Sequence, residues 1–199
     1  MTNEMNNVKI NGVNEVENKG EAKMINVMNI SDEELSKNMY DFLKEYPGIE
    51  NVGKKLCEEA ENSYEYHEGD EDEIEYFTFR FFGIKFRANK PKNPNESEDI
   101  ILNSMLQLTD FMRSAKDFDM TVNSNNLVQR NGYTFNIYGK ADPNAKNPRY
   151  TEWLGYIKFE VNNDKEFIET LDDFETLFMP ALGGKPDKNK VEAMIRRRG

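Results

Sequence analysis

The chain contains a single cysteine, Cys57, and a single histidine, His67, among its 199 residues. One cysteine cannot form an internal disulfide, which indicates a reducing compartment. One histidine without a cysteine pair leaves no zinc site of ordinary composition. Any Cys–His or Ser–His–Asp mechanism would have to use His67. Cys57 itself is expected on the apolar face of a helix, where a buried thiol is inert.

Long hydrophobic runs are also missing. No segment reaches the roughly 18 consecutive apolar residues of a membrane helix, and residues 1–29 lack the apolar stretch of a secretory signal. We therefore expect no membrane association and a location in the cytoplasm of a cell or within an assembled particle. Residues 1–29 show no apolar period either, which predicts a flexible polar arm ahead of the folded domain.

Catalytic and cofactor motifs are absent from the sequence. Gly183, Gly184 and Lys185 resemble part of a phosphate-binding loop, but that motif's first glycine and its Ser or Thr are missing. The three residues also follow a predicted helix, whereas a phosphate-binding loop follows a strand. No catalytic residue and no cofactor is indicated, and we expect that the protein is not an enzyme.

Basic residues are the minority charge, because 26 Lys and Arg stand against 37 Asp and Glu and give a net charge of −11. They are unevenly distributed: residues 77–92 carry five basic residues and no acidic residue. Acidic residues concentrate in the segments 31–62 and 164–178, which are predicted to be helical, and in the loop 68–76. Such asymmetry is informative about binding partners.

Apolar spacing predicts an α+β fold with elements in the order ααββαβββα. Phe77, Phe79 and Phe81 alternate with polar residues, as in a half-buried strand, and the Asn-Gly pair at 131–132 is a strong hairpin signal. The four helices are expected over residues 31–46, 49–62, 97–118 and 164–178, and the five strands over residues 73–81, 84–89, 121–129, 133–140 and 150–161.

Tight turns between consecutive strands imply an antiparallel sheet of about five strands, with one face covered by the four helices. A single α+β domain would then span residues 30–180. The remaining residues, 181–199, are rich in Lys and Arg and are predicted to form a basic C-terminal tail.

Single-stranded nucleic acid is one predicted class of partner, because proteins that bind it combine a basic groove with aromatic side chains on strands. The candidate contacts are ten residues of the predicted strands and their loops: Arg80, Phe82, Lys85, Arg87, Lys90, Lys92, Arg130, Lys140, Arg149 and Lys158. The alternative is that these strands merely present the polar outer face of a half-buried sheet, with Phe77, Phe79 and Phe81 in the core. The net charge of −11 also opposes general attraction to phosphates.

A protein partner or self-assembly is the other predicted class. The candidate acidic partner surface is a run of like charges, Glu68, Asp70, Glu71, Asp72 and Glu73. Such runs are usually solvated or interaction segments. This one lacks the spacing of a calcium-binding loop, so no metal is expected.

These considerations lead to one main prediction and one alternative. The main prediction is a non-catalytic interaction protein of phage or mobile-element type. It would bind a protein stoichiometrically, as a virion or assembly component or as an inhibitor of a host nucleic-acid-handling system. The alternative is a single-stranded nucleic-acid-binding protein that uses the basic aromatic strands.

Overall fold

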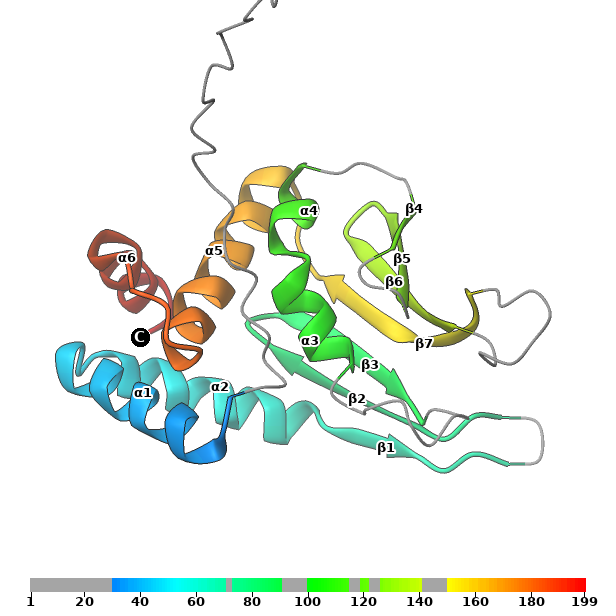
Figure 1. Cartoon of the computed structure of the whole chain (residues 1–199), viewed down its shortest axis with the longest axis horizontal. Coiled ribbons are helices and arrows are strands. Elements are labelled where there is room, and N and C mark those ends of the chain that lie inside the picture. Colours follow the sequence, from blue (N-terminus) through cyan, green and yellow to red (C-terminus); the bar gives the residue numbers. More distant parts are fainter. Residues whose placement is uncertain (1–29, 71–72, 91–99, 115–118, 122–125, 141–149) are drawn as a thin grey trace, which may run out of the picture.

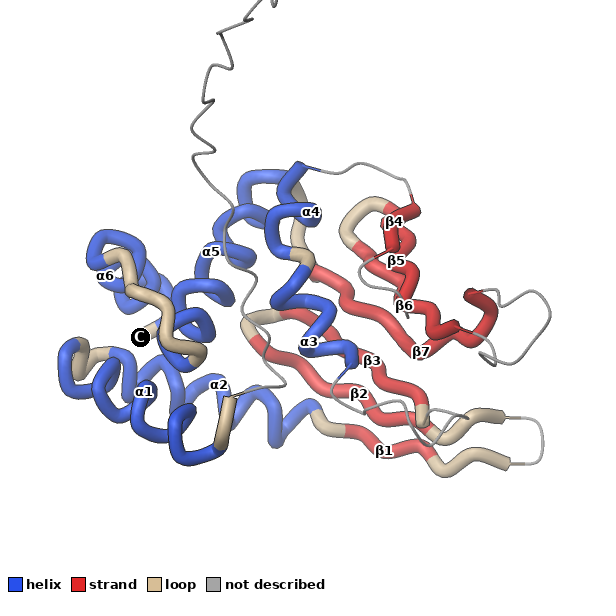
Figure 2. The backbone as a smooth tube through the Cα atoms, viewed as in Figure 1, coloured by secondary structure: helices blue, strands red, loops and turns tan. Residues whose placement is uncertain are grey.

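A computed structural model describes residues 30–70, 73–90, 100–114, 119–121, 126–140 and 150–199 (Figure 1). These residues form six helices: α1 (Asp32–Glu45), α2 (Ile49–Ser63), α3 (Ile100–Gln107), α4 (Thr109–Ser114), α5 (Asp164–Ala181) and α6 (Lys188–Arg198). They also form seven strands: β1 (Glu65–His67), β2 (Tyr76–Phe81), β3 (Ile84–Asn89), β4 (Asp119–Thr121), β5 (Asn126–Asn131), β6 (Thr134–Lys140) and β7 (Tyr150–Phe159). The strands gather on one side of the molecule, while α1, α2 and α6 form its other end (Figure 2).

The predicted α+β class, with an antiparallel sheet and helices on one face, is confirmed. The described residues contain more elements than expected. β1 and β4 add two edge strands of three residues each. The helix predicted over 97–118 appears as two shorter helices, α3 and α4, and α6 follows the last predicted helix. The predicted arm, residues 1–29, lies outside the described residues.

The seven strands form one sheet in the order β1-β2-β3-β7-β6-β5-β4, and all neighbouring strands are antiparallel. The hairpins β2–β3 and β5–β6 therefore lie on either side of β7, the last strand in the chain. Phe86 of β3 lies opposite Phe79 of β2 and opposite Ile157 of β7. Directly opposed side chains share a face of the sheet. Because Phe86 and Ile157 are 1% and 0% exposed, this row marks the core side of the sheet.

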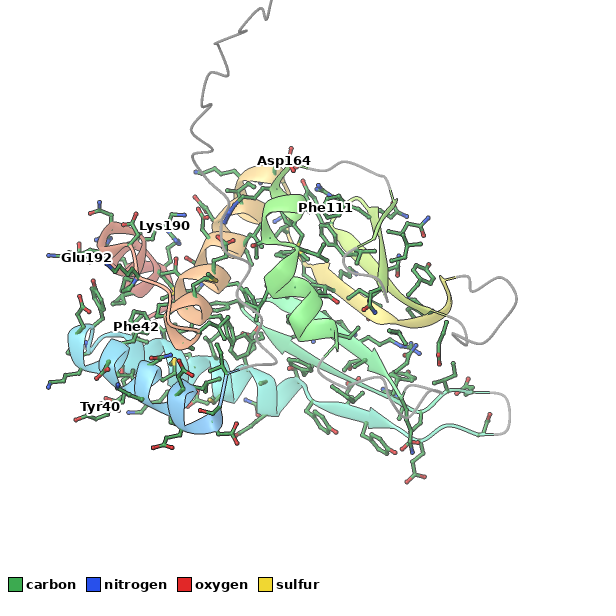
Figure 3. All side chains as sticks on the ribbon, in the orientation of Figure 1. Tyr40, Phe42, Phe111, Asp164, Lys190 and Glu192 are labelled. Carbon is green, nitrogen blue, oxygen red and sulfur yellow. The ribbon has the colours of Figure 1, made fainter. Side chains whose placement is uncertain are left out.

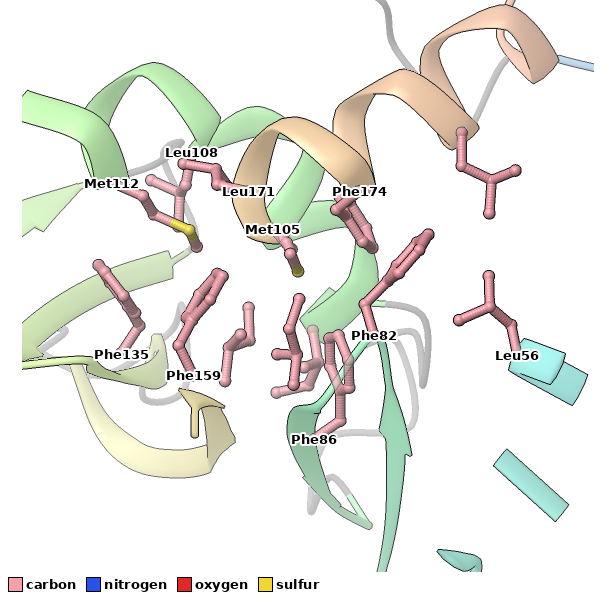
Figure 4. Close-up of a cluster of buried hydrophobic side chains, with 14 of the residues drawn as sticks. Leu56, Phe82, Phe86, Met105, Leu108, Met112, Phe135, Phe159, Leu171 and Phe174 are labelled. Atoms are coloured by element: carbon pink, nitrogen blue, oxygen red, sulfur yellow. The ribbon is translucent and has the colours of Figure 1, made fainter. Parts of the chain in front are cut away.

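Helices α3, α4 and α5 cover the core side. Figure 4 shows their apolar side chains meeting those of the strands in one layer between helices and sheet. Met105 of α3 and Phe174 of α5 are both 0% exposed there, and so is Phe135 of β6. Burying a side chain of this size stabilises the fold by about 1.5–3 kcal/mol relative to leaving it exposed, so this layer fixes the helices on one side of the sheet.

The other side of the sheet is called the outer face. It is formed by the residues that alternate with the core residues: Tyr76, Thr78 and Arg80 on β2, Lys85, Arg87 and Asn89 on β3, Thr134, Asn136 and Tyr138 on β6, and Tyr156 and Lys158 on β7. None of these side chains belongs to the hydrophobic cluster or to the apolar side chains packed against it, as far as the described residues define that cluster. The outer face therefore takes no part in the core.

The helix pair α1–α2 leads into the edge of the sheet. Ser31 accepts a hydrogen bond from the backbone N–H of Glu34 at 3.2 Å and so caps the start of α1. At the other end of the pair, the backbone N–H of Arg80 donates to Ser63 Oγ at 2.7 Å. The N–H of Gly83 donates to Glu59 Oε1 at 2.8 Å. α2 thus satisfies backbone groups of β2 and its turn that the short β1 does not reach.

The C-terminal segment is a packed helix, so the prediction of a basic tail over 181–199 is wrong. Val191 and Met194 of α6 are both 0% exposed and belong to the core cluster. Arg198 Nε donates to Asp173 Oδ2 of α5 at 2.9 Å, and the Asp173 side chain is only 1% exposed. The high content of Lys and Arg hid a short apolar stripe with i, i+3 spacing, which is sufficient to dock a helix.

Candidate functional site

A row of three basic side chains crosses the outer face. Lys85 of β3 lies directly opposite Arg80 of β2 and directly opposite Lys158 of β7. Directly opposed side chains of antiparallel strands have Cβ atoms about 4.5–5.5 Å apart, and like charges at that separation are destabilising. The stability of the sheet therefore does not explain why three basic residues lie side by side. Arg80, Lys85 and Lys158 are called the basic row.

Only one member of the basic row is neutralised by an acid in the described part of the chain. Arg80 Nε and Glu160 Oε2 are 2.9 Å apart, and neither Lys85 nor Lys158 takes part in an ion pair there. The hydrogen bond from Arg80 lowers the pKa of Glu160, and the charges of Arg80, Lys158 and Lys85 lower it further, while partial burial opposes the shift. The row consequently keeps positive charge available to a ligand.

A strip of stacked rings lies next to the basic row and is centred on Arg87. His67 stacks on Tyr76 with ring centroids 4.3 Å apart. The guanidinium carbon of Arg87 lies 3.5 Å from the ring centroid of Tyr76 and 4.7 Å from that of Trp153. Trp153 in turn stacks against Tyr156, with centroids 6.3 Å apart. These five residues are called the Arg87 strip, and its cation–π contacts hold the rings side by side.

Arg87 is held in place by a short chain of hydrogen bonds. Its Nε donates to Asn89 Oδ1 at 2.9 Å, and Asn89 Nδ2 donates to the backbone carbonyl of Trp153 at 2.8 Å. Asn89 is 6% exposed, so this link between β3 and β7 is shielded from water. The guanidinium plane is thereby oriented before any ligand arrives.

Trp153 reaches the outer face through an irregularity in β7. Ile137 of β6 pairs with Gly155, whereas the next residue, Tyr138, pairs with Trp153. Leu154 is therefore the extra residue of a β-bulge and is 2% exposed. A bulge changes the alternation of side chains along a strand, and it brings Trp153 to the same face as Tyr156.

Four of the predicted contact residues are brought together by the fold. Arg80, Lys85, Arg87 and Lys158 occupy adjacent positions on three neighbouring strands of the outer face. Their role in binding stays a prediction, but the geometry they require is present. The sequence reasoning did not select His67, Tyr76 or Trp153 as contacts. The period of two in β2 could have identified Tyr76, since it shares parity with Arg80.

Phe82 and Arg130 were predicted as contacts on the basic side, and the structure corrects both. Phe82 is 1% exposed and has a φ of 58° in the β2–β3 turn, which takes its ring out of the strand alternation and into the core. Arg130 lies opposite Phe135 on the core side of the sheet. Its Nη1 donates to the backbone carbonyl of Met112 on α4 at 3.2 Å, so it supports the helix layer.

Of the other predicted basic contacts, only Lys90 has a described side chain, and it is not part of the outer-face site. Lys90 Nζ lies 2.6 Å from Glu75 Oε2, just beyond the end of β3. Lys140 is the last residue of β6, and its side chain lies outside the described residues, as do Lys92 and Arg149 altogether.

The predicted acidic partner surface is described in part. Glu68, Asp70 and Glu73 are exposed, and Asp70 Oδ1 accepts a hydrogen bond from the N–H of Glu73 at 3.0 Å. Glu71 and Asp72 lie outside the described residues. Among the residues with a described position, no group of three or more His, Cys, Asp or Glu side chains could hold a metal ion.

Cys57 also differs from its expected position. The thiol-bearing residue is exposed on α2, whereas helical spacing predicted burial. α2 buries Ile49, Val52 and Leu56, and Cys57 lies beside that stripe, outside it.

Fold and site together define an α+β protein whose sheet presents an open surface of basic and aromatic side chains. No family model, no curated protein and no solved structure matches the chain. None of the helices in the described segments combines the length and the apolar character that a membrane span requires. Any inference about the function of the protein must therefore be drawn from its fold and from the side chains of the outer face.

Proposed function

We propose that the protein binds single-stranded nucleic acid across the outer face of its sheet. The basic row would follow the phosphates, and the Arg87 strip would lie under the bases. The observation that carries the proposal is the juxtaposition of the two rows on a sheet face that takes no part in the core.

The basic row supports this proposal because its three positive charges repel one another when no ligand is bound. Lys85 lies between Arg80 and Lys158, and their mutual repulsion is relieved when phosphates bind between them. The neutralised member, Arg80, remains 42% exposed at its side chain. A phosphate can therefore compete with Glu160 for its guanidinium group.

The Arg87 strip supports the same proposal through its shape. Base–aromatic stacking contributes about 1–3 kcal/mol per base and tolerates any sequence, because every base has a π-face. Trp153, Tyr156 and Tyr76 are all partly exposed; the first two belong to β7 and Tyr76 belongs to β2, with Arg87 of β3 between them. A strand of nucleic acid that crosses the β-strands would meet one ring after another.

The overall charge limits the affinity. At a net charge of −11, distant phosphates are repelled and only those next to the basic row are attracted. We therefore expect weak binding that has no sequence preference, with dissociation constants on the order of 10⁻⁴–10⁻⁶ M at physiological salt.

Fluorescence anisotropy with a labelled oligothymidine of about 12 nucleotides tests the proposal. Binding should be strongest at about 50 mM salt and should decrease steeply by about 200 mM. The variant Lys85→Glu/Lys158→Glu should lose about tenfold or more of the affinity, because two phosphate contacts become repulsive. The new carboxylate at position 85 lies directly opposite Arg80, but it also lies opposite the new carboxylate at position 158, so circular dichroism first establishes that the variant is folded.

The matched control is Lys54→Glu/Lys188→Glu, which makes the same charge change on the helices at side chains that are 66% and 75% exposed. This control should retain most of the affinity. The proposal fails if no binding occurs at low salt, or if the control variant loses as much affinity as the outer-face variant.

A second function, self-association, is favoured by one observation on α1. Tyr40 is 66% exposed and Leu35 is 39% exposed, and Figure 3 shows Tyr40 directed outward while Phe42 of the same helix points inward. The first turn of α1 carries Asp32, Glu33 and Glu34. We propose that this acidic and apolar surface of one copy contacts the basic row of another, as charge complementarity suggests.

Sedimentation velocity at low and moderate salt tests self-association. A concentration-dependent dimer should appear at low salt and should disappear in Tyr40→Arg and in Lys85→Glu/Lys158→Glu. The helix control Lys54→Glu/Lys188→Glu should still dimerise. A monomer at every concentration would remove this second proposal without affecting the first.

A further inference from the structure

A pocket of about 400 Å³ lies beside the ends of β1, β2 and β3. Its lining consists of Tyr64, Tyr66, Glu75, Tyr76, Phe77, Asn89 and Lys90. Tyr66 lies opposite Phe77 in the register, and Phe77 is among the side chains packed against the core. The walls formed by Tyr66 and Phe77 therefore lie on the core side of the sheet, away from the basic row, whereas Tyr76 and Asn89 belong to the outer face. The volume is within the range of small-molecule sites.

The aromatic walls provide a stacking surface. Tyr64 and Phe77 are stacked, with centroids 6.2 Å apart and ring planes inclined by 26°. Tyr64 is 56% exposed and Tyr66 is 49% exposed, so much of both rings faces water at the pocket. A planar ring placed on Tyr64 would remove that apolar surface from water and continue an existing stack.

The polar wall consists of one carboxylate between two donors. Glu75 accepts a hydrogen bond from the Tyr66 hydroxyl and one from Lys90 Nζ, the latter at 2.6 Å. The bonds from Lys90 and Tyr66 lower the pKa of Glu75, and the bond to Glu75 raises the pKa of Tyr66 to about 12. At neutral pH the pocket therefore presents an acceptor and a donor side by side.

The charged side chains at the pocket determine which kinds of planar ligand could stack there. The ammonium of Lys90 already lies against Glu75, so it would repel a cationic guest from an otherwise cage-like group of rings. Glu75 lines the pocket, and Glu68 is close enough to Tyr66 to raise its pKa by its negative charge, so a phosphate in the pocket would be repelled by nearby carboxylates. A purely apolar ligand would leave the Glu75–Lys90 pair without new partners while removing water from it.

We propose that this pocket binds an uncharged nucleobase, as the free base or the nucleoside. Its ring stacks on Tyr64, and its polar edge exchanges hydrogen bonds with Glu75 and Lys90. Base edges carry neighbouring donors and acceptors, which is the complement of this pair. Tyr76 lines this pocket and also belongs to the Arg87 strip, but the inference does not rest on the proposed function, because the stacking wall and the Glu75–Lys90 pair belong to neither the basic row nor the Arg87 strip.

Isothermal titration calorimetry with adenosine, guanosine, cytidine and uridine tests the inference, and each 5′-monophosphate is measured alongside. At least one nucleoside should bind, and its monophosphate should bind more weakly. Tyr64→Ala should weaken nucleoside binding by about fivefold or more, which corresponds to the loss of one stacking contact. Tyr40→Ala, which removes a tyrosine of α1 that is 66% exposed, should bind like the wild type.

Lys90→Met provides a second variant that keeps the side-chain stem and removes the donor, and it should also weaken nucleoside binding. Lys85→Glu/Lys158→Glu should leave nucleoside binding unchanged, which separates this site from the outer face. The inference is overturned if no nucleoside binds at millimolar concentration, if both pocket variants bind like the wild type, or if N-acetyltryptophanamide binds as tightly as the nucleosides.

Discussion

Asp173 of α5 accepts hydrogen bonds from two consecutive arginines of α6, Arg197 and Arg198. The Asp173 side chain is 1% exposed, whereas the arginine side chains are 39% and 32% exposed. The carboxylate is therefore buried with its counter-ions at the surface, and the hydrogen bond that Arg197 donates to Asp173 raises the pKa of Arg197. This arrangement ties the C-terminal helix to the domain.

Replacing that carboxylate should loosen α6. Asp173→Asn keeps the shape of the side chain but removes the charge that both guanidinium groups share. We expect a loss of about 1–3 kcal/mol in the free energy of unfolding, with the lower end favoured because the arginines can return to water. Urea denaturation measures the difference.

The matched control for this change is Glu192→Gln on α6, where the side chain is 47% exposed and lies 3.9 Å from Lys188. It should change stability by less than about 0.5 kcal/mol. Equal effects of the two variants would contradict a structural role of the Asp173 contacts.

Gly155 of β7 should be intolerant of any side chain. Its φ is +142°, and a Cβ atom there would overlap the carbonyl oxygen of Arg87 on the neighbouring strand. Gly155→Ala should therefore destabilise the protein by about 3 kcal/mol or more, through backbone strain and strand separation. Thermal unfolding followed by circular dichroism measures the loss.

A second glycine serves as the control and should respond in the opposite direction. Gly53 lies within α2, and a Cβ atom there has no neighbour within 4 Å. Gly53→Ala should stabilise the protein by about 0.5–1 kcal/mol, because alanine restricts the unfolded chain and favours the helix. A destabilised Gly53→Ala would show that α2 packs differently from this description.

The sequence predicted what depends on local pattern. The strand of Phe77 and Phe79 was recognised by its period of two, and the strand bounds predicted at 81 and 84 agree with the end of β2 and the start of β3. The predicted hairpin joins β5 and β6, but its two turn residues are Gly132 and Tyr133, one position beyond the predicted Asn131-Gly132, and Gly132 has a positive φ of 59°. In each case neighbours in the chain carry the information.

The sequence failed where alternation is interrupted or where distant segments meet. Phe82 was assigned to the basic side by counting along the strand, but its left-handed turn conformation directs it into the core. Arg130 was placed beyond a strand that in fact extends to Asn131 and puts it on the core side. Trp153 depends on a bulge in β7 that pairing with β6 defines. Each error concerns one residue, yet the positions of these residues determine which side chains share the outer face.

The ion pair between Arg80 and Glu160 should make stability depend on pH in acid. The pKa of Glu160 is lowered in the folded protein, first by the hydrogen bond from Arg80. Its contribution to stability is therefore complete above the unfolded-state pKa of about 4.3, and it is lost as the pH falls through the lower folded-state value. Because 35% of the Glu160 side chain is exposed, solvent screening keeps this contribution below about 1 kcal/mol.

Urea denaturation of the wild type and of Glu160→Gln between about pH 7 and pH 3 tests this dependence. The difference in unfolding free energy should be constant above about pH 5 and should shrink below about pH 4. A double-mutant cycle with Arg80→Gln isolates the pair. A difference that persists unchanged to the lowest pH would assign it to packing, not to charge.

Trp153 is the only tryptophan of the chain and lies within the Arg87 strip, so its emission should report directly on the outer face. Stacking of a base on the indole ring should quench the emission. Titration with oligothymidine should give the same dissociation constant by quenching as by anisotropy, and Lys85→Glu/Lys158→Glu should weaken both signals together. Arg87→Ala should affect the two signals differently. The quenching should change, because the ring of Trp153 loses its cation–π neighbour, whereas the anisotropy change should remain, because the basic row still attracts the phosphates. Anisotropy that rises while Trp153 emission stays constant in the wild type would mean that nucleic acid binds elsewhere on the molecule.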